Sequence, residues 1–417
     1  MKSLIFDLVC TCSQFKWWLP SDRSIKVLFS LGLLSAFMLG VFELLFPIYL
    51  NYRNVSLFDM GLILSISTLA ISFFRIFVGE YSDVYGRKRV YLASCAFGAI
   101  AKSVLSLSLG KIEILLGRFL DDLYNNLRNS VNNVMLYEKA REAYAKIFSW
   151  STTSNFLLQA AGNISFATLL LYFGYSGCFF LLAGMEIVMF FGILLYKEDH
   201  NAVKRKISIR EAYSFKINRN LMILALSSAI ATLGFGIAHG SYLLPLYFGE
   251  KYGLDLAQIS IVSAIHRLAY LTTPVSTLAI RKLGIIKTYI LSTLAYAISF
   301  LAIGLITFPI FIFMPIFLIH DLLGGGIRQT AMNVIVQSQA ADGRRGREAN
   351  TFNTIQTPMS VIAPTIAGIL AAKGWDNIFI VGGLLYIVSL LIFCLFFKAN
   401  ALTSQEAEAK GKASANS

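Results

Sequence analysis

Residues 59–109 read DMGLILSISTLAISFFRIFVGEYSDVYGRKRVYLASCAFGAIAKSVLSLSL: an apolar run, a short basic loop and a second apolar run. Each run has about the 20 residues that a helix needs to cross the hydrocarbon core of a bilayer. A chain exposed to lipid must satisfy its own backbone hydrogen bonds, and a run of this length does so as a helix. The stretch therefore predicts two membrane-spanning helices joined by a tight basic turn.

The same pattern continues along the rest of the chain. Hydrophobic residues make up 56% of the 417 residues and charged residues only 14%, and the mean hydropathy is +0.66. A soluble domain carries about 25% charged residues, so this chain has too few to cover its surface with water-facing groups. We therefore expect an all-α membrane protein with twelve transmembrane helices. The apolar runs lie at 26–50, 59–79, 90–109, 112–136, 146–172, 176–196, 219–247, 257–280, 285–306, 309–337, 350–372 and 377–397.

The basic residues give the expected orientation. Of the 36 Lys and Arg residues, only Arg53, Lys111, Lys251 and Lys373 fall in the loops on one side of the predicted membrane. Because basic loops stay in the cytoplasm, we expect an integral plasma membrane protein with both termini cytoplasmic. The charge is spread over many loops, which favours contact with anionic lipid head groups over binding to nucleic acid.

The second half of the chain repeats the first. The offset is 198 residues between the first three runs and their counterparts, and 200 residues from the fourth run onward. Six spans per repeat give both units the same topology, so we expect two pseudo-symmetric six-helix halves related by an axis along the membrane normal. The matches include Leu45, Pro47 and Tyr49 with Leu243, Pro245 and Tyr247, Gly86 and Tyr91 with Gly284 and Tyr289, and Asp121, Arg128 and Asn133 with Asp321, Arg328 and Asn333. The predicted divisions are a tail at 1–25, a half at 26–197, a linker at 198–218, a half at 219–398 and a disordered cytoplasmic tail at 399–417.

The basic loop Gly79–Arg89, GEYSDVYGRKR, resembles the signature loop of the major facilitator superfamily, Gly-x-x-x-Asp-x-x-Gly-Arg-Lys/Arg-Lys/Arg. The resemblance covers about residues 26–398. It implies a transporter that works by alternating access, with the loop acting as a cytoplasmic gating latch between the halves. Alternatively, the basic residues serve only to fix the topology. The residues concerned are Gly79, Asp83, Gly86, Arg87 and Lys88.

The fourth run carries charges that cannot face lipid. A charge at mid-bilayer costs about 3 kcal/mol even on a lenient scale, so these side chains must face other helices or a wet cavity. The resemblance implies that the fourth and tenth spans line the central cavity. Two interpretations remain open: the structural ion pairs Arg118–Asp122 and Asp121–Arg128, or a substrate and proton pathway. The number of polar groups favours the second. The candidates are Arg118, Asp121, Asp122, Asn125 and Arg128, with Asp321 and Arg328 in the tenth span.

Other ionisable residues inside the spans are weaker candidates. Glu43 and His239 are expected at similar depth towards the outer side, and His266 and Arg267 near mid-depth. Adjacent residues on a helix point in different directions, so we expect His320 to point away from Asp321. We expect Lys102 to extend its amine to the interface, and Glu186 has no evident role.

These observations favour a proton-coupled secondary transporter for a small polar or charged organic solute. The alternatives are a multidrug or metabolite exporter of the same superfamily and a membrane receptor or sensor that has lost transport. The fifth span lacks the Gly-Pro pattern that the resemblance associates with exporters, since it reads Gln159-Ala-Ala-Gly-Asn163. No nucleophile–base set, phosphate-binding loop or metal-ligand spacing is visible, so we expect no enzymatic activity, no cofactor and no metal. The expected partners are the small-molecule substrate, protons and membrane lipids, with the protein as a monomer.

Overall fold

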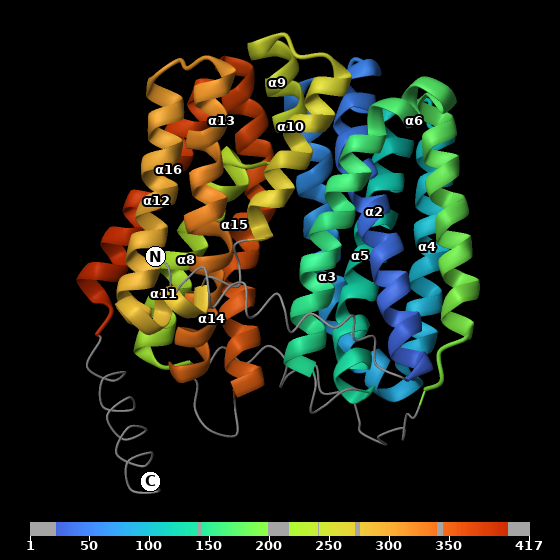
Figure 1. Ribbon diagram of the computed structural model, residues 1–417, viewed down its shortest axis with the longest axis horizontal. Helices are drawn as coiled ribbons and strands as arrows, with labels where there is room; N and C mark the ends of the chain where they lie inside the picture. The colour runs from blue at the N-terminus through green and yellow to red at the C-terminus, as the bar shows by residue number, and fades with distance from the viewer. Residues whose placement is uncertain are drawn as a thin grey trace, which may run out of the picture.

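The computed structural model describes residues 22–139, 144–198, 217–240, 242–271, 276–339 and 345–398. The regular structure in these ranges is entirely helical, and the helices run along a common direction in two side-by-side bundles (Figure 1). The expectation of an all-α membrane protein is therefore confirmed. The predicted tail 399–417, most of the tail 1–25 and residues 199–216 of the predicted linker lie outside the described residues.

The first bundle holds the helices of the N-terminal half (Figure 1). α6 contains one non-helical residue, Gly174 (φ 62°, ψ −178°), at which the predicted fifth and sixth spans meet. The predicted first span starts slightly too late, because Asp22 caps the first helix through the amides of Ser24 and Ile25. The helices are α2 (Arg23–Tyr52), α3 (Leu57–Tyr85), α4 (Arg87–Leu107), α5 (Lys111–Lys139) and α6 (Tyr144–Leu194).

The second bundle holds the C-terminal half, where three predicted spans are interrupted. The seventh divides into α8 and α9, and Pro245 stands in the first turn of α9, where its missing N–H costs nothing. The eighth divides into α10 and α11, and the tenth contains a π-helical turn, η2, five residues after Pro315. The elements are α8 (Arg219–Ala238), α9 (Leu244–Tyr252), α10 (Leu256–Leu268), α11 (Ser276–Leu283), α12 (Ile285–Leu305), α13 (Ile310–Ile319), η2 (His320–Gly325), α14 (Gly326–Gln339), α15 (Arg345–Lys373) and α16 (Asp376–Phe396).

Within the described ranges, nine helical stretches are long and apolar enough to cross a membrane. The predicted count of twelve is larger for identifiable reasons. The stretch at 150–194 contains two helices that meet at Gly174, α10 is too short, and α5 carries too many charged residues. Length and composition alone therefore identify fewer spans than the repeat predicts.

The repeat is visible in the backbone. Gly86 (φ 95°) precedes α4 and Gly284 (φ 79°) precedes α12, and these two helices have the same length of 21 residues. Only glycine adopts such positive φ values without strain, so both halves require glycine at this turn. Gly174 and Gly374, which are equivalent at the offset of 200, also have positive φ values.

The two halves touch where α3 crosses α15. A Cβ atom on Gly61 would lie 2.3 Å from the carbonyl oxygen of Pro364, and one on Gly368 would lie 2.3 Å from that of Leu57. The backbones can approach this closely only because both positions are glycine. Beside them, the Thr365 hydroxyl lies 2.7 Å from Ser65 Oγ. The contact therefore rests on backbone and hydroxyl groups.

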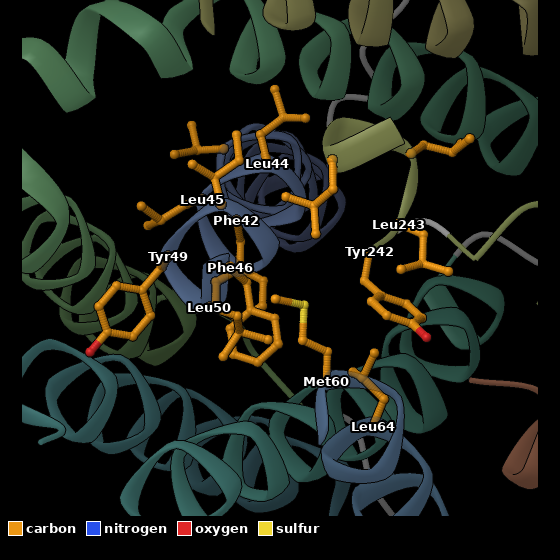
Figure 2. Packing of buried hydrophobic residues seen from close by; sticks show 14 of the residues in the cluster. Phe42, Leu44, Leu45, Phe46, Tyr49, Leu50, Met60, Leu64, Tyr242 and Leu243 are labelled. Atoms are coloured by element: carbon orange, nitrogen blue, oxygen red, sulfur yellow. The ribbon is translucent and has the colours of Figure 1, made fainter. Parts of the chain in front are cut away.

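The hydrophobic core runs through both halves. Figure 2 shows Phe46 of α2 and Met60 and Leu64 of α3 in the same packed region as Tyr242 and Leu243 of the C-terminal half. All five side chains are buried members of one cluster. The halves are thus joined by apolar packing around the polar cavity described next.

Candidate functional site

A cavity of about 510 Å³ lies between the two halves. Pockets of roughly 300–1,000 Å³ are typical of sites for small organic molecules. The N-terminal half lines it with α2, α3 and α5, and the C-terminal half with α8, α10 and α15. Its acidic, basic and amide lining residues are Glu43, Arg118, Asp121, Asn125, His239 and Arg267, all six of them predicted site residues.

An ion pair across this cavity joins the halves. Arg267 of α10 donates to the carboxylate of Glu43 of α2. Both side chains are mostly buried, with exposed fractions of 13% and 20%. The sequence placed these residues in different spans of different halves, and the structure brings them into contact.

Behind the cavity wall, Asp121 belongs to a three-residue charge cluster. Lys102 Nζ lies 2.7 Å from Asp121 Oδ1 and 3.2 Å from Glu186 Oε1. The expectation that Lys102 reaches the membrane interface is wrong, because its side chain is only 3% exposed. The amine stays inside because two buried carboxylates compensate its charge. The same contact gives Glu186 the role that the sequence did not reveal.

The remaining charges of α5 pair only partly as expected. Arg118 and Asp122 form the expected pair, with 2.6 Å between Nη2 and Oδ1, and Ser67 donates to the same carboxylate. The second pair of the structural interpretation, Asp121–Arg128, does not form. Arg128 instead donates to Ser35 and Tyr124, and it lies 3.3 Å from the amide oxygen of Asn125.

The C-terminal half holds a buried group of three histidines and one aspartate. His239 Nε2 lies 2.9 Å from His266 Nε2, and His266 Nε2 also contacts Asp321 Oδ2. His320 Nε2 lies 3.3 Å from Asp321 Oδ1. The expectation that His320 points away from Asp321 is therefore wrong. Both residues begin the π-helical turn η2, where the angle between neighbouring side chains differs from that of an α-helix.

Arg328 lies apart from this cluster. Its guanidinium carbon is 5.4 Å from the centre of the Tyr289 ring and 5.6 Å from that of Tyr386. The side chain is half-buried and its charge faces aromatic rings. A cation–π arrangement of this kind stabilises the charge without a carboxylate.

The predicted gating loop is mostly helix. Residues 79–85 continue α3, and Gly86 alone makes the turn to α4. Glu198 accepts hydrogen bonds from the backbone amides of Arg87 and Lys88, at 2.6 and 3.2 Å, and so caps the N-terminus of α4. The Lys88 amine donates to two carbonyl oxygens at the end of α6, and Arg87 pairs with Glu138. These contacts lie inside the N-terminal half, and the side chain of Asp83 is outside the described residues.

Three site residues escaped the sequence analysis: Lys102, Glu186 and His320. The only sequence signal for the first two was the cost of an unpaired charge inside a span. Each lies on a different element from at least one of its partners, so no spacing along one helix could identify the contact.

Comparisons with known proteins agree with this fold. The family model described as Major Facilitator Superfamily matches residues 28–364. The tetracycline resistance protein, class B, of Escherichia coli is 21% identical over 94% of this chain and 100% of its own length. A single-substitution variant of the nucleoside transporter NupG has a similar structure, with a TM-score of 0.77 at 13% identity over 89% of this chain and 99% of its own. A human organic anion transporter gives a TM-score of 0.66 at 15% identity over 90% of this chain and 100% of its own.

Proposed function

Since this chain belongs to the Major Facilitator Superfamily, we propose that it moves a small polar or charged organic solute by alternating access, driven by protons. The chain is a membrane transporter and not an enzyme. We further propose that it acts as a monomer in the plasma membrane with both termini cytoplasmic. The positions of its basic residues support this orientation.

The cavity between the halves is the observation that carries the proposal. Its walls come from both bundles, so a rocking motion of one bundle against the other would change which side of the membrane it faces. Glu43 and Arg267 close one part of this path with an ion pair between the halves. A charged solute that competes for either partner would loosen that pair and couple binding to the motion.

Charge balance supports proton coupling in the N-terminal half. Around α5, three cations face three carboxylates, so the fully ionised cluster has no net charge: Arg118, Lys102 and Arg128 against Asp121, Asp122 and Glu186. A proton taken up by this group leaves one positive charge in a poorly solvated place. An anionic solute in the cavity would offset that charge, which links the two binding events.

Asp121 is the proposed proton carrier because it lies both at the cavity wall and in the buried charge cluster. It lines the cavity, and it also contacts Lys102 and, at 3.8 Å, Arg118. When Asp121 is protonated, Lys102 keeps Glu186 as its partner, so the lysine is never left without a carboxylate. We also retain the proposal that Asp83 latches the two halves on the cytoplasmic side.

Transport into proteoliposomes tests the proposal. The panel contains a nucleoside, an organic anion and tetracycline, the compound classes that appear in the names of the similar proteins. We expect an inward-directed proton gradient to raise the initial rate for at least one compound at least about tenfold over liposomes without protein. Absence of both transport and thermal stabilisation by every compound, extended to amino acids and sugars, would contradict the proposal.

Asp121→Asn separates proton coupling from binding. We expect this variant to exchange labelled for unlabelled solute across the membrane but to respond no longer to the proton gradient. Asp59→Asn is the matched control, because Asp59 pairs with Lys111 at the end of the bundle, away from the cavity. A response to the gradient in Asp121→Asn equal to that of the wild type would exclude Asp121 as the proton carrier.

Export of drugs or metabolites is a second candidate function. The aromatic side chains Phe42, Phe46 and Phe235 line part of the cavity and would suit an aromatic compound. The similarity to the tetracycline resistance protein over almost the whole chain points the same way. Transport into inside-out vesicles distinguishes uptake from export, because an exporter accumulates tetracycline in these vesicles only when their interior is acidic.

A further inference from the structure

We propose that the C-terminal half contains a binding site for one divalent first-row transition-metal ion, formed by His239, His266, His320 and Asp321. The inference goes beyond the proposed function, because it concerns a resident ion site and not the transported solute. It arises from three parts of the chain that are far apart in sequence: the end of α8, α10 and η2.

The spacing of the four groups fits a metal ion. One ligand atom from each of the four residues lies within 4.8 Å of all the others. Zinc–nitrogen bonds of about 2.0–2.1 Å in a tetrahedron place the ligand atoms roughly 3.3 Å apart. The observed separations of 2.9 Å between the two histidine Nε2 atoms and 3.3 Å between His320 Nε2 and Asp321 Oδ1 lie close to this value. Small side-chain rotations would therefore complete the coordination.

The hydrogen bonding of His320 leaves a lone pair directed at the cluster. Its Nδ1 contacts the carbonyl oxygen of Phe317, which can only accept, so Nδ1 carries the proton. In the neutral ring Nε2 is then an acceptor, and it faces the carboxylate of Asp321, which is also an acceptor. A histidine whose other nitrogen donates to a backbone carbonyl has the arrangement usual for metal ligands.

Three buried polar atoms of this group are not satisfied by hydrogen bonds. His320 Nε2 and both carboxylate oxygens of Asp321 are buried and make no hydrogen bond of acceptable geometry, although both residues are 0% exposed. Unsatisfied buried polar groups are costly and rare in native proteins. A cation between these acceptors would satisfy them all at once, whereas a single proton would relieve only one contact.

The donor set and its surroundings select the type of ion. Three imidazoles and one carboxylate suit Zn²⁺, Co²⁺, Ni²⁺ or Fe²⁺ better than Mg²⁺ or Ca²⁺, which prefer oxygen ligands. Aromatic rings pack around the group, with Phe317 at 4.5 Å and Phe300 at 4.9 Å from the His320 ring centre. Such an apolar shell fixes the ligands and limits competition from water.

The site can be reached from the cavity. His239 lines both the large cavity and a neighbouring void of about 30 Å³, and His266 lines the void. Glu43 and Arg267 line the same two spaces. An ion in the cavity therefore meets His239 first, and the deeper ligands complete the site.

Cobalt spectroscopy of the full-length protein tests the proposal. The protein is purified in detergent with a tag that contains no histidine, treated with a chelator, dialysed and titrated with Co²⁺. We expect one equivalent to bind with the intense visible absorption of tetrahedral Co²⁺, Zn²⁺ to displace it, and a large excess of Mg²⁺ to leave the spectrum unchanged. Absence of a stoichiometric tetrahedral spectrum in the wild-type protein would overturn the proposal without any variant.

Variants locate the site. We expect His320→Gln and Asp321→Asn each to weaken Co²⁺ binding at least about 100-fold, since loss of an outer partner of a ligand alone costs 10–100-fold. His200→Gln changes the one histidine of the chain that is not a proposed ligand, and Asp121→Asn changes the repeat-equivalent aspartate; both variants should bind Co²⁺ like the wild type. Unchanged binding in the double variant His266→Gln/His320→Gln would show that the ion sits elsewhere and would refute the assignment. Because the readout is ion binding, failure here leaves the transport proposal intact, and the reverse also holds.

Discussion

The two halves place an aspartate at the same repeat position but surround it differently. Asp121 lies against the permanent charge of Lys102, whereas Asp321 lies against two imidazoles. At the offsets of the repeat, Lys102 corresponds to Phe300 and Glu186 to Tyr386. The C-terminal half has thus replaced a buried ion pair with aromatic rings. Histidines from α8, α10 and η2 provide the polar partners instead.

In each half, the fold sets the position of the aspartate, whereas the neighbouring side chains set its chemistry. α4 and α12 keep the same length and the same glycine turn, and the aspartates occupy the same place in the repeat, so the position of the aspartate is set by the fold. Its chemistry depends on neighbours that the repeat does not preserve. Full charges in one half suit a proton and an ionic solute, whereas imidazoles in the other half suit a metal ion.

The largest expected effect is the loss of the N-terminal ion cluster. Lys102→Met leaves two buried carboxylates without their cation and should lower the free energy of unfolding by about 3–5 kcal/mol. The repeat-equivalent change Phe300→Leu should cost less, about 1–2 kcal/mol, because it removes only part of a buried apolar side chain and leaves no unpaired charge. Unfolding by SDS titration measures both. The deficit of Lys102→Met should shrink at lower pH, as protons neutralise the two carboxylates. Equal losses of unfolding free energy in Lys102→Met and Phe300→Leu would show that the buried charges of the N-terminal half contribute no more to stability than the aromatic packing of the C-terminal half.

A smaller loss of stability is expected at Arg128 and Arg328, which occupy equivalent positions of the repeat. Arg128→Lys removes a guanidinium that donates to Ser35 and Tyr124, so it should cost about 1–2 kcal/mol. Arg328→Lys keeps a cation beside two tyrosine rings and should cost less than about 1 kcal/mol. The same SDS titrations compare them. The opposite ranking would mean that Arg328 has stronger partners than its aromatic neighbours.

The smallest effect concerns the ion pair that joins the two halves. Glu43→Gln removes the negative charge of the mostly buried pair with Arg267 but keeps an oxygen that can accept from the guanidinium, so we expect a loss of about 1 kcal/mol, which changes the ratio of two conformations roughly 5-fold. Spin labels on cysteines at the exposed positions Leu109 and Phe311, in a background without other cysteines, report the separation of the halves. The charge swap Glu43→Arg with Arg267→Glu should restore the wild-type distance distribution. An identical distribution in Glu43→Gln and the wild type would remove this pair from the conformational change.

The fold could be predicted from the sequence because its signals are local. The lengths of the apolar runs and the basic turn before Arg87 each depend on residues close together in the chain, and the all-helical bundle follows from them. The interruption between α8 and α9 was not predicted, although Gly240 and Pro245 stand beside it, because the run 219–247 is apolar enough overall to be taken for one span.

The site was only partly predictable because partners are set by tertiary contacts. The polar face of α5 indicated that Asp121 and Arg118 avoid lipid, and in the structure both line the cavity. Helical periodicity cannot say which helix lies opposite, so the contact of Lys102 with Glu186, 84 residues away, was hidden. His320 was misjudged because the prediction assumed a regular α-helix, whereas the chain forms a π-helical turn there.

The crossing of α3 and α15 at Gly61 and Gly368 has a consequence for the physical conditions under which the halves stay together. Its contacts are van der Waals packing of backbone atoms and the hydroxyl pair of Ser65 and Thr365. Such contacts are not screened by ions, and their separation moves no elementary charge through the membrane field. Separation at this crossing should therefore be insensitive to ionic strength and to membrane voltage. Any electrical signal that accompanies a transport cycle must then come from the charged groups of the cavity and their cargo.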